Sequence, residues 1–325
     1  MATKEALAAP DLAIVLAPRG KHGLALRNPV MTASGTFGNA VEFAGAVDIG
    51  RLGAIVSKAV TLRPRTGNPT PRTVETPAGM LNSIGLQNIG VAALIRDVAP
   101  IWATWAVPAI VNIAADRVDD FAELAARLDG VPGVAALEVN ISCPNVDNGL
   151  EFGAQPAGAA AVTSAVRRRT GLPLIVKLTP NTGDIAGVAR AAEDAGADAL
   201  CVANTLLGMA IDVRRRRPVL ARGRGGLSGP AVRPVILRMV WDVAGVTGVP
   251  IVASGGIASG NDALQYILAG ATAVQVGTAS FREPAAALRV LEEVKAALPA
   301  LGARSVTEII GAARGMIDRA ADSGV

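Results

Sequence analysis

The strongest constraint on this chain is a regular alternation of short apolar, β-branched runs with Ala-rich amphipathic stretches. Each run is bounded by Gly, Pro or Asn, and this alternation is typical of βαβ units whose parallel strands are buried on both faces. Because eight such units close a barrel, the pattern predicts an α/β protein of the (β/α)8 TIM-barrel class. The predicted strands begin near Val30, Ala54, Ala109, Leu137, Leu174, Ala199, Ile251 and Ala273.

The stretches between the runs carry apolar residues at three- and four-residue spacing, which predicts helices packed outside the strands. Glycines stand where C-terminal helix caps belong, at Gly196 and Gly270. The clearest predicted helices cover residues 118–128, 157–169, 184–195 and 232–243.

Length and composition favour one core. A chain of 325 residues is long enough for two average domains, but barrels of this size form one unit, and no linker rich in Ser, Gly or Pro divides the sequence. We therefore expect a single domain over residues 1–325. Two connections, residues 60–106 and 205–248, are longer than a simple crossover requires, and long loops in a compact barrel are usually functional.

Charge, aromatic content and cysteine content exclude several function classes. The net charge of +4 is scattered except at Arg214–Arg217, which we interpret as a solvated loop face, and 3% aromatic residues are too few for stacking on nucleic acid. Two cysteines without a C-x-x-C pair supply neither a disulfide framework nor a metal site.

No segment has the pattern of an export signal or a membrane span. Pro10 and Asp11 interrupt the apolar part of the first residues, and Pro100, Pro108 and Asn112 divide the uncharged stretch 98–115. That stretch is predicted to be a helix end followed by a buried strand. We expect a cytoplasmic protein.

Active sites of such barrels lie at the carboxyl ends of the strands, so the residues leaving each strand are informative. Every predicted exit is polar or glycine, and backbone N–H groups in the last two loops commonly bind phosphate in this fold. A phosphorylated cofactor or substrate is therefore expected. The exits carry Ser34 and Gly35, Lys58, Asn112, Asn140 to Cys143, Lys177, Asn204 and Thr205, Gly255 and Gly256, and Gly277 and Thr278.

Cys143 is the best candidate for moving a proton. The only histidine, His22, precedes the first strand, whereas Cys143 follows a strand in NISCPN, where a thiolate is a competent base or nucleophile. The alternative for Cys143 is a buried loop thiol. Cys201 lies within the apolar run ALCVAN and is interpreted as a buried small hydrophobic residue.

Two lysines and four asparagines accompany the cysteine. Lys58 and Lys177 end strands whose own runs contain no carboxylate, which argues against structural salt bridges. Asparagine amides offer both donors and acceptors, the mixture that a cyclic imide such as a pyrimidine requires, although each asparagine alone is explained by an Asx turn. Asn82, Asn140, Asn145 and Asn204 are predicted to lie in strand-exit loops.

The motifs together resemble the catalytic subunit of class 1 dihydroorotate dehydrogenases, and most closely the class 1B type. The resemblance runs almost from end to end of the chain. Its motifs are NPVMTASG (28–35), SKAVT (57–61), GMLNSIGLQNIG (79–90), NISCPNV (140–146), VKLTPN (176–181), NTLLGMAID (204–212), GGLSGPA (225–231), SGGI (254–257) and QVGTA (275–279). DNGLEFG after NISCPNV and SGGI in place of MGGI depart from the usual family pattern.

The resemblance implies a site at the barrel mouth that holds FMN and dihydroorotate. In the implied reaction Cys143 removes the C5 proton, hydride passes from C6 to flavin N5, and Lys58 contacts both flavin and substrate as a second catalytic residue. Lys177 would stabilise negative charge on the reduced flavin. The implied FMN positions are Ser34, Lys58, Ala59, Asn112, Asn140, Lys177, Ala203, Gly229, Gly255, Gly256, Gly277 and Thr278. The implied substrate positions are Lys58, Asn82, Ser83, Ile84, Gly85, Leu86, Asn140, Asn145, Asn204 and Thr205.

The resemblance also implies partners and leaves alternatives open. Class 1B enzymes pass electrons to NAD through a subunit with FAD and a 2Fe-2S cluster, so a homodimeric core within a heterotetramer is expected. Class 2 members differ by a serine base and an amino-terminal membrane helix. The alternatives are a fumarate-dependent class 1A enzyme, a dihydropyrimidine dehydrogenase-like flavoprotein, a lyase or aldolase with a Schiff base on Lys177, and a non-catalytic docking subunit.

Overall fold

The computed structural model describes residues 9–18, 20, 23–142 and 152–315. Its centre is an eight-stranded parallel sheet with the order β3-β16-β15-β10-β9-β8-β7-β4, and a parallel bridge between Met31 and Ala54 closes the sheet into a barrel. The predicted (β/α)8 barrel is thus confirmed, and all eight predicted runs supply its strands. These are β3 (Val30–Thr32), β4 (Ile55–Val56), β7 (Ala109–Ile113), β8 (Ala136–Asn140), β9 (Leu174–Lys177), β10 (Ala199–Val202), β15 (Ile251–Ser254) and β16 (Ala273–Val276).

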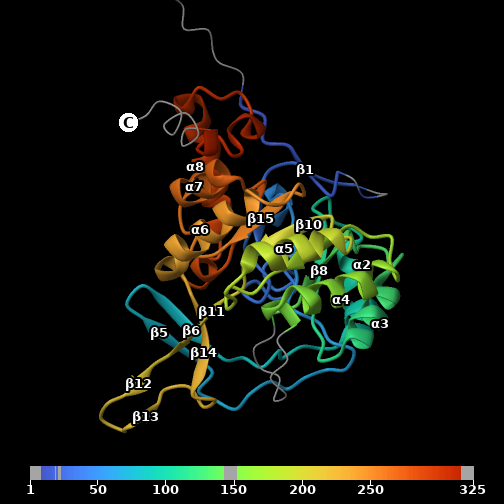
Figure 1. Ribbon diagram of the computed structural model, residues 1–325, viewed down its shortest axis with the longest axis vertical. Helices are drawn as coiled ribbons and strands as arrows, with labels where there is room; N and C mark the ends of the chain where they lie inside the picture. The colour runs from blue at the N-terminus through green and yellow to red at the C-terminus, as the bar shows by residue number, and fades with distance from the viewer. Residues whose placement is uncertain (1–8, 19, 21–22, 143–151, 316–325) are drawn as a thin grey trace, which may run out of the picture.

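Helices pack around the barrel as their apolar spacing predicts (Figure 1). In α3 (Val118–Leu128) the buried residues Phe121, Leu124, Ala125 and Leu128 recur at helical spacing and form the face toward the strands. The other long helices are α4 (Pro156–Arg167), α5 (Ile185–Asp194), α6 (Arg233–Ala244), α7 (Gly260–Ala269) and α8 (Ala286–Ala297). The predicted bounds of α3 to α6 agree with the structure within two residues at each end.

Both predicted cap glycines have backbone angles that favour glycine. Gly270 ends α7 with a φ of 123°, and Gly196 follows the last residues of α5 with a φ of 104°. Shorter helical turns complete the connections: α1 (Val91–Ala93), η2 (Leu94–Val98), α2 (Ala99–Trp102), η1 (Ile49–Arg51), η3 (Phe152–Ala154), η4 (Pro230–Val232), η5 (Thr278–Phe281), η6 (Leu298–Leu301) and η7 (Val306–Ile309). Residues 98–115 form a helix end followed by β7, as predicted.

The two long connections are not simple loops, because they build a second sheet together. β5 (Thr73–Thr76) and β6 (Gly79–Asn82) from the first pair with β11 (Leu206–Met209) and β14 (Arg224–Ser228) from the second, in the antiparallel order β11-β14-β6-β5. We call these four strands the accessory sheet. Figure 1 shows it at one end of the molecule, beside the barrel. Asn82 therefore ends strand β6 and pairs with Gly226, so its predicted place in a strand-exit loop is wrong.

A two-stranded hairpin extends from the accessory sheet. It comprises β12 (Ile211–Asp212) and β13 (Arg217–Pro218), and Figure 1 shows it projecting away from the barrel. Arg214 to Arg216 lie in its turn and Arg217 begins β13, and all four are exposed. A further hairpin near the N-terminus, β1 (Ile14–Leu16) with β2 (Leu24–Leu26), was not predicted from the sequence. Among the described residues, no helix combines the length and apolar character that a membrane crossing requires.

The pairing of β6 with β14 depends on a glycine, which gives a test of the accessory sheet. A Cβ at Gly79 would lie 2.0 Å from the carbonyl oxygen of Ser228, closer than any real contact. We predict that Gly79→Ala lowers the free energy of unfolding by about 1–3 kcal/mol, the usual cost of overpacking. Gly45→Ala is the control, because a Cβ there has no neighbour within 4 Å. Equal effects of the two changes in chemical denaturation would contradict this account.

Candidate active site

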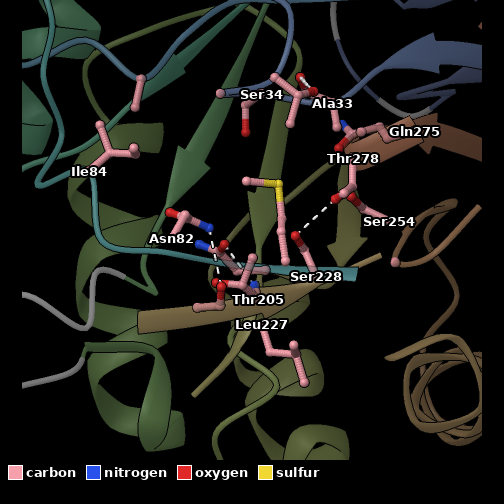
Figure 2. Close-up of a pocket in the computed structure, with 18 of the residues that line it drawn as sticks. Ala33, Ser34, Asn82, Ile84, Thr205, Leu227, Ser228, Ser254, Gln275 and Thr278 are labelled. Carbon is pink, nitrogen blue, oxygen red and sulfur yellow. Dashed lines mark hydrogen bonds between the residues drawn. The ribbon is translucent and has the colours of Figure 1, made fainter. Parts of the chain in front are cut away.

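A cavity of about 390 Å³ lies between the carboxyl ends of the barrel strands and the accessory sheet. Figure 2 shows side chains from both parts facing into it, with Ser34, Gln275 and Thr278 from the barrel and Asn82 and Ser228 from the accessory sheet. A hydrogen bond of 2.8 Å from the Thr278 hydroxyl to the Ser228 hydroxyl connects the two parts. The cavity is therefore enclosed by elements that are far apart in the sequence.

Most of the predicted site residues that the structure describes line this cavity. They are Ser34, Lys58, Ala59, Asn82, Ile84, Gly85, Leu86, Asn140, Lys177, Ala203, Asn204, Thr205, Gly255, Gly256, Gly277 and Thr278. Three others are not among the lining residues: Asn112 is buried within β7, Ser83 is buried beside Asn68, and Gly229 lies behind Gly256. Cys143, Asn145 and His22 lie outside the described residues.

One end of the cavity is a glycine cradle, which we define as Gly255, Gly256 and Gly277. A Cβ at Gly256, where φ is +70°, would lie 2.7 Å from the carbonyl oxygen of Gly229, so only glycine fits. Among the described residues, the backbone N–H group of Gly256 donates to no other group. A free N–H group just after β15, at the mouth of the barrel, suits a phosphate.

An amide and hydroxyl network lines another side of the cavity. Asn140 Oδ1 accepts from the Ser142 hydroxyl at 2.8 Å and from Asn204 Nδ2 at 3.2 Å. Asn204 Nδ2 also donates to the Ser142 hydroxyl at 2.6 Å, and Asn204 Oδ1 accepts from the backbone N–H of Thr205 at 2.8 Å. These bonds fix both amides and leave the Nδ2 group of Asn140 without a partner among the described residues. The site thus presents an oriented donor to a ligand.

Lys177 is ion-paired, contrary to the argument from its own sequence run. Its Nζ lies 3.4 Å from Glu138 Oε1 on the adjacent strand β8, and it also donates to Ser34 Oγ at 3.1 Å and Gln275 Oε1 at 3.3 Å. Parallel strand pairing brings the carboxylate close although 39 residues separate the two in sequence. Burial opposes the lysine charge, but the Glu138 carboxylate outweighs it and raises the pKa of Lys177. A protonated lysine is no nucleophile, which disfavours the Schiff-base alternative.

Lys58 has the opposite electrostatic environment. It follows β4, lines the cavity, and makes no salt bridge with any described residue. Burial, with a smaller contribution from the charge of Arg72, lowers the pKa of Lys58. An anionic ligand would supply the missing counter-charge at this position.

Sequence reasoning missed two kinds of lining or supporting residue. The first comes from the accessory sheet: Thr73, Met80, Gly226, Leu227 and Ser228. The second comprises Gln275, which lines the cavity, and the fully buried Glu138 beneath it. Both are polar residues inside apolar strand runs, LEVNIS and AVQVGT, and that contrast was the available signal. Among the described residues, no group of three potential metal ligands is present.

The mouth of the barrel combines the glycine cradle with two lysines in opposite electrostatic environments. These features define a class of site that suits a phosphorylated, anionic ligand. Comparison with known proteins identifies the family. A family model described as dihydroorotate dehydrogenase matches residues 20–298, so the chain belongs to the dihydroorotate dehydrogenase family.

Individual relatives agree with this family. The chain is 58% identical over 293 residues to a protein of Trichlorobacter lovleyi named "Dihydroorotate dehydrogenase B (NAD(+)), catalytic subunit", covering 90% of this chain and 96% of that one. A protein of Desulforudis audaxviator with the same name is 56% identical, covering 90% of this chain and 95% of the other. The crystal structure of DHODH from Eimeria tenella in complex with ferulenol superimposes with a TM-score of 0.78 at 26% identity, covering 93% and 88% of the two chains.

The glycine cradle gives a test of the phosphate site. If the cradle binds the phosphate of a flavin cofactor, Gly256→Ala should weaken flavin binding about tenfold or more, or about 1.4 kcal/mol, because the new Cβ displaces the backbone at the cradle. Gly302→Ala is a matched control: its φ of +71° imposes the same backbone strain, but a Cβ there meets nothing within 4 Å. Equal FMN dissociation constants for the two variants, measured by flavin fluorescence, would remove the cradle from the site.

Proposed function

We propose that this protein oxidises dihydroorotate to orotate in pyrimidine biosynthesis, using FMN bound at the barrel mouth and passing the electrons toward NAD. The observation that carries the proposal is a cavity with a glycine cradle, the charged Lys177, and Lys58 without a salt bridge to any described residue, in a chain of this family. The relatives named as NAD(+)-linked catalytic subunits support the same reaction.

The residues present fit FMN. The N–H group of Gly256, which has no acceptor among the described residues, suits its phosphate, and Lys177 with Ser34 offers donors to the flavin ring. Asn112 Oδ1 is buried without a hydrogen-bond partner in the described part of the chain. Burying a polar atom without a partner is costly, so the neighbourhood of Asn112 is more stable when a bound group supplies a donor. Bound FMN would serve as the hydride acceptor.

The remaining polar groups fit dihydroorotate. Lys58 is the unpaired cation for the substrate carboxylate, and the amides of Asn140 and Asn204 lie together to pair with the ring N–H and C=O groups. Asn82, anchored to the carbonyl oxygen of Gly226 at 3.3 Å, and residues 83–86 contribute from the accessory-sheet side. We include Asn145 and Thr205 in this set.

Three residues have separate roles in the proposed reaction. Cys143, as a thiolate, removes the proton from C5 of the substrate. Lys58 holds the substrate carboxylate and orients the ring. Lys177, kept protonated by Glu138, offers positive charge beside the position where negative charge develops on reduction.

We also propose a partner subunit. The relatives are named catalytic subunits, which implies at least one further subunit in those proteins. We propose that a subunit with FAD and a 2Fe-2S cluster takes the electrons to NAD, in a heterotetramer built on a homodimer of this chain.

Turnover assays with defined acceptors test the function. Orotate formation is measured for the isolated chain with fumarate, and with NAD in the presence and absence of the FAD/iron–sulfur partner. We expect NAD-linked turnover only with the partner. Turnover with fumarate alone would favour the class 1A alternative, and uracil oxidising the reduced flavin faster than dihydroorotate reduces the oxidised form would favour the dihydropyrimidine dehydrogenase alternative.

Loss of the proposed base should separate chemistry from binding. We predict that Cys143→Ala slows substrate oxidation by about 10² to 10⁴ while FMN stays bound, the range for removing a positioned general base. The wild-type rate should rise with pH toward a thiol pKa of about 8.5. Cys201→Ala is the control cysteine, since Cys201 is fully buried in β10. A pH-independent rate, or equal slowing by both changes, would contradict a thiolate base at Cys143.

The lowered pKa of Lys58 predicts a pH dependence of orotate binding. Because burial lowers this pKa, Lys58 loses its charge at a lower pH than an ordinary lysine of about 10.4. Orotate affinity should therefore fall with rising pH, beginning below the ordinary lysine pKa of about 10.4. Lys58→Met should bind orotate more weakly and without this dependence, whereas the exposed Lys295→Met should behave as wild type. Parallel profiles for wild type and Lys58→Met in equilibrium titrations would refute the assignment.

A further inference from the structure

We propose that Glu138 is a positioning residue, which holds Lys177 protonated and directed at the floor of the cavity and thereby raises the reduction potential of the flavin. This inference rests on the proposed function, because it concerns the group that Lys177 faces. Glu138 is not among the residues lining the cavity, so it acts through Lys177.

The geometry gives the carboxylate a complete set of partners. Glu138 is 0% exposed; its Oε1 accepts from Asn112 Nδ2 at 2.6 Å and from Lys177 at 3.4 Å, and its Oε2 accepts from Gln275 Nε2 at 2.5 Å. Gln275 lies on β16, four strands from β8 in the closed order. The network therefore crosses the inside of the barrel.

Glu138 also determines how Gln275 is oriented. Because Gln275 donates with Nε2 to Glu138, its Oε1 faces Lys177 and accepts from the ammonium at 3.3 Å. Glu138 thus acts on the ammonium twice, directly by charge and indirectly by turning an amide oxygen toward it. A fully buried ion pair contributes little to net stability compared with apolar packing, so this arrangement is not explained by stability alone.

Among the described residues, no other carboxylate contacts Lys177. The groups around its Nζ besides Glu138 are the neutral Ser34 and Gln275 and, on β10, the thiol of Cys201. Burial raises the pKa of Cys201, so its thiol stays neutral near neutral pH. With Glu138 neutralised, burial is the largest influence on the pKa of Lys177, and fully buried lysines without a partner titrate several pH units below the ordinary value.

Flavin potentials of matched variants test the proposal. In Glu138→Gln, Lys177 becomes neutral near neutral pH, so the oxidised-to-reduced ratio at a fixed potential should rise about tenfold, or about 30 mV for a two-electron couple. The potential should recover as the pH falls and Lys177 regains its proton. Adding Glu138→Gln to Lys177→Met should cause no further change in the flavin potential, and Glu123→Gln, at a partly exposed carboxylate on the outer helix α3, should match wild type. If Glu138→Gln shifts the flavin potential equally with Lys177 present and in Lys177→Met, the proposal is overturned.

The apoprotein gives a second readout that needs no flavin. In Glu138→Gln, Lys177 is protonated in the unfolded state but neutral in the folded state. The free energy of unfolding should therefore rise from about pH 6 to 9 relative to wild type. In Lys177→Met the unpaired Glu138 becomes neutral, so stability should fall over the same range. The stability of the double variant should depend on pH as that of wild type does. If wild type, both single variants and the double variant all show the same pH dependence, the proposal is overturned. Failure of wild type to bind flavin would instead refute the proposed function and leave this test intact.

Discussion

Closure of eight parallel strands is the constraint on which the rest of the structure depends. It places the carboxyl ends of all eight strands in one ring, so residues as distant as Ser34, Lys177 and Gln275 come within hydrogen-bonding distance. The bridge between Met31 and Ala54 completes that ring. The accessory sheet then covers the mouth, and the Ser228–Thr278 hydrogen bond connects the cover to the last barrel strand.

Within this frame, two lysines at one cavity have opposite electrostatic environments. The Glu138 carboxylate keeps the charge of Lys177 inside the barrel, where burial alone would remove it. Lys58 has no such partner in the part of the chain that the structure describes, and its pKa is lowered by burial. One cation is therefore compensated before any ligand binds, while the other gains most from an anionic ligand. On this difference rests the proposal that Lys177 serves the flavin and Lys58 the carboxylate of the substrate.

The barrel and most of the lining residues were predictable, because strand and helix periodicity are local properties of the sequence. Pairing between distant segments was not. Asn82 was assigned to a loop because nothing near it shows that β6 meets β14, about 144 residues later. Lys177 was judged free of carboxylates because only its own run was considered, whereas its partner Glu138 lies on the neighbouring strand. The cysteine and asparagine of NISCPN stay predictions, since Cys143 and Asn145 lie outside the described residues.

Anaerobic rapid mixing of the FMN-loaded protein with dihydroorotate tests the central claim most directly, because it isolates the first half of the reaction from any partner subunit. The account predicts that the flavin absorbance bleaches in a single turnover and that one orotate forms for each flavin reduced. Flavin that stays oxidised in the presence of saturating dihydroorotate would contradict the account and favour a non-catalytic docking role for the barrel.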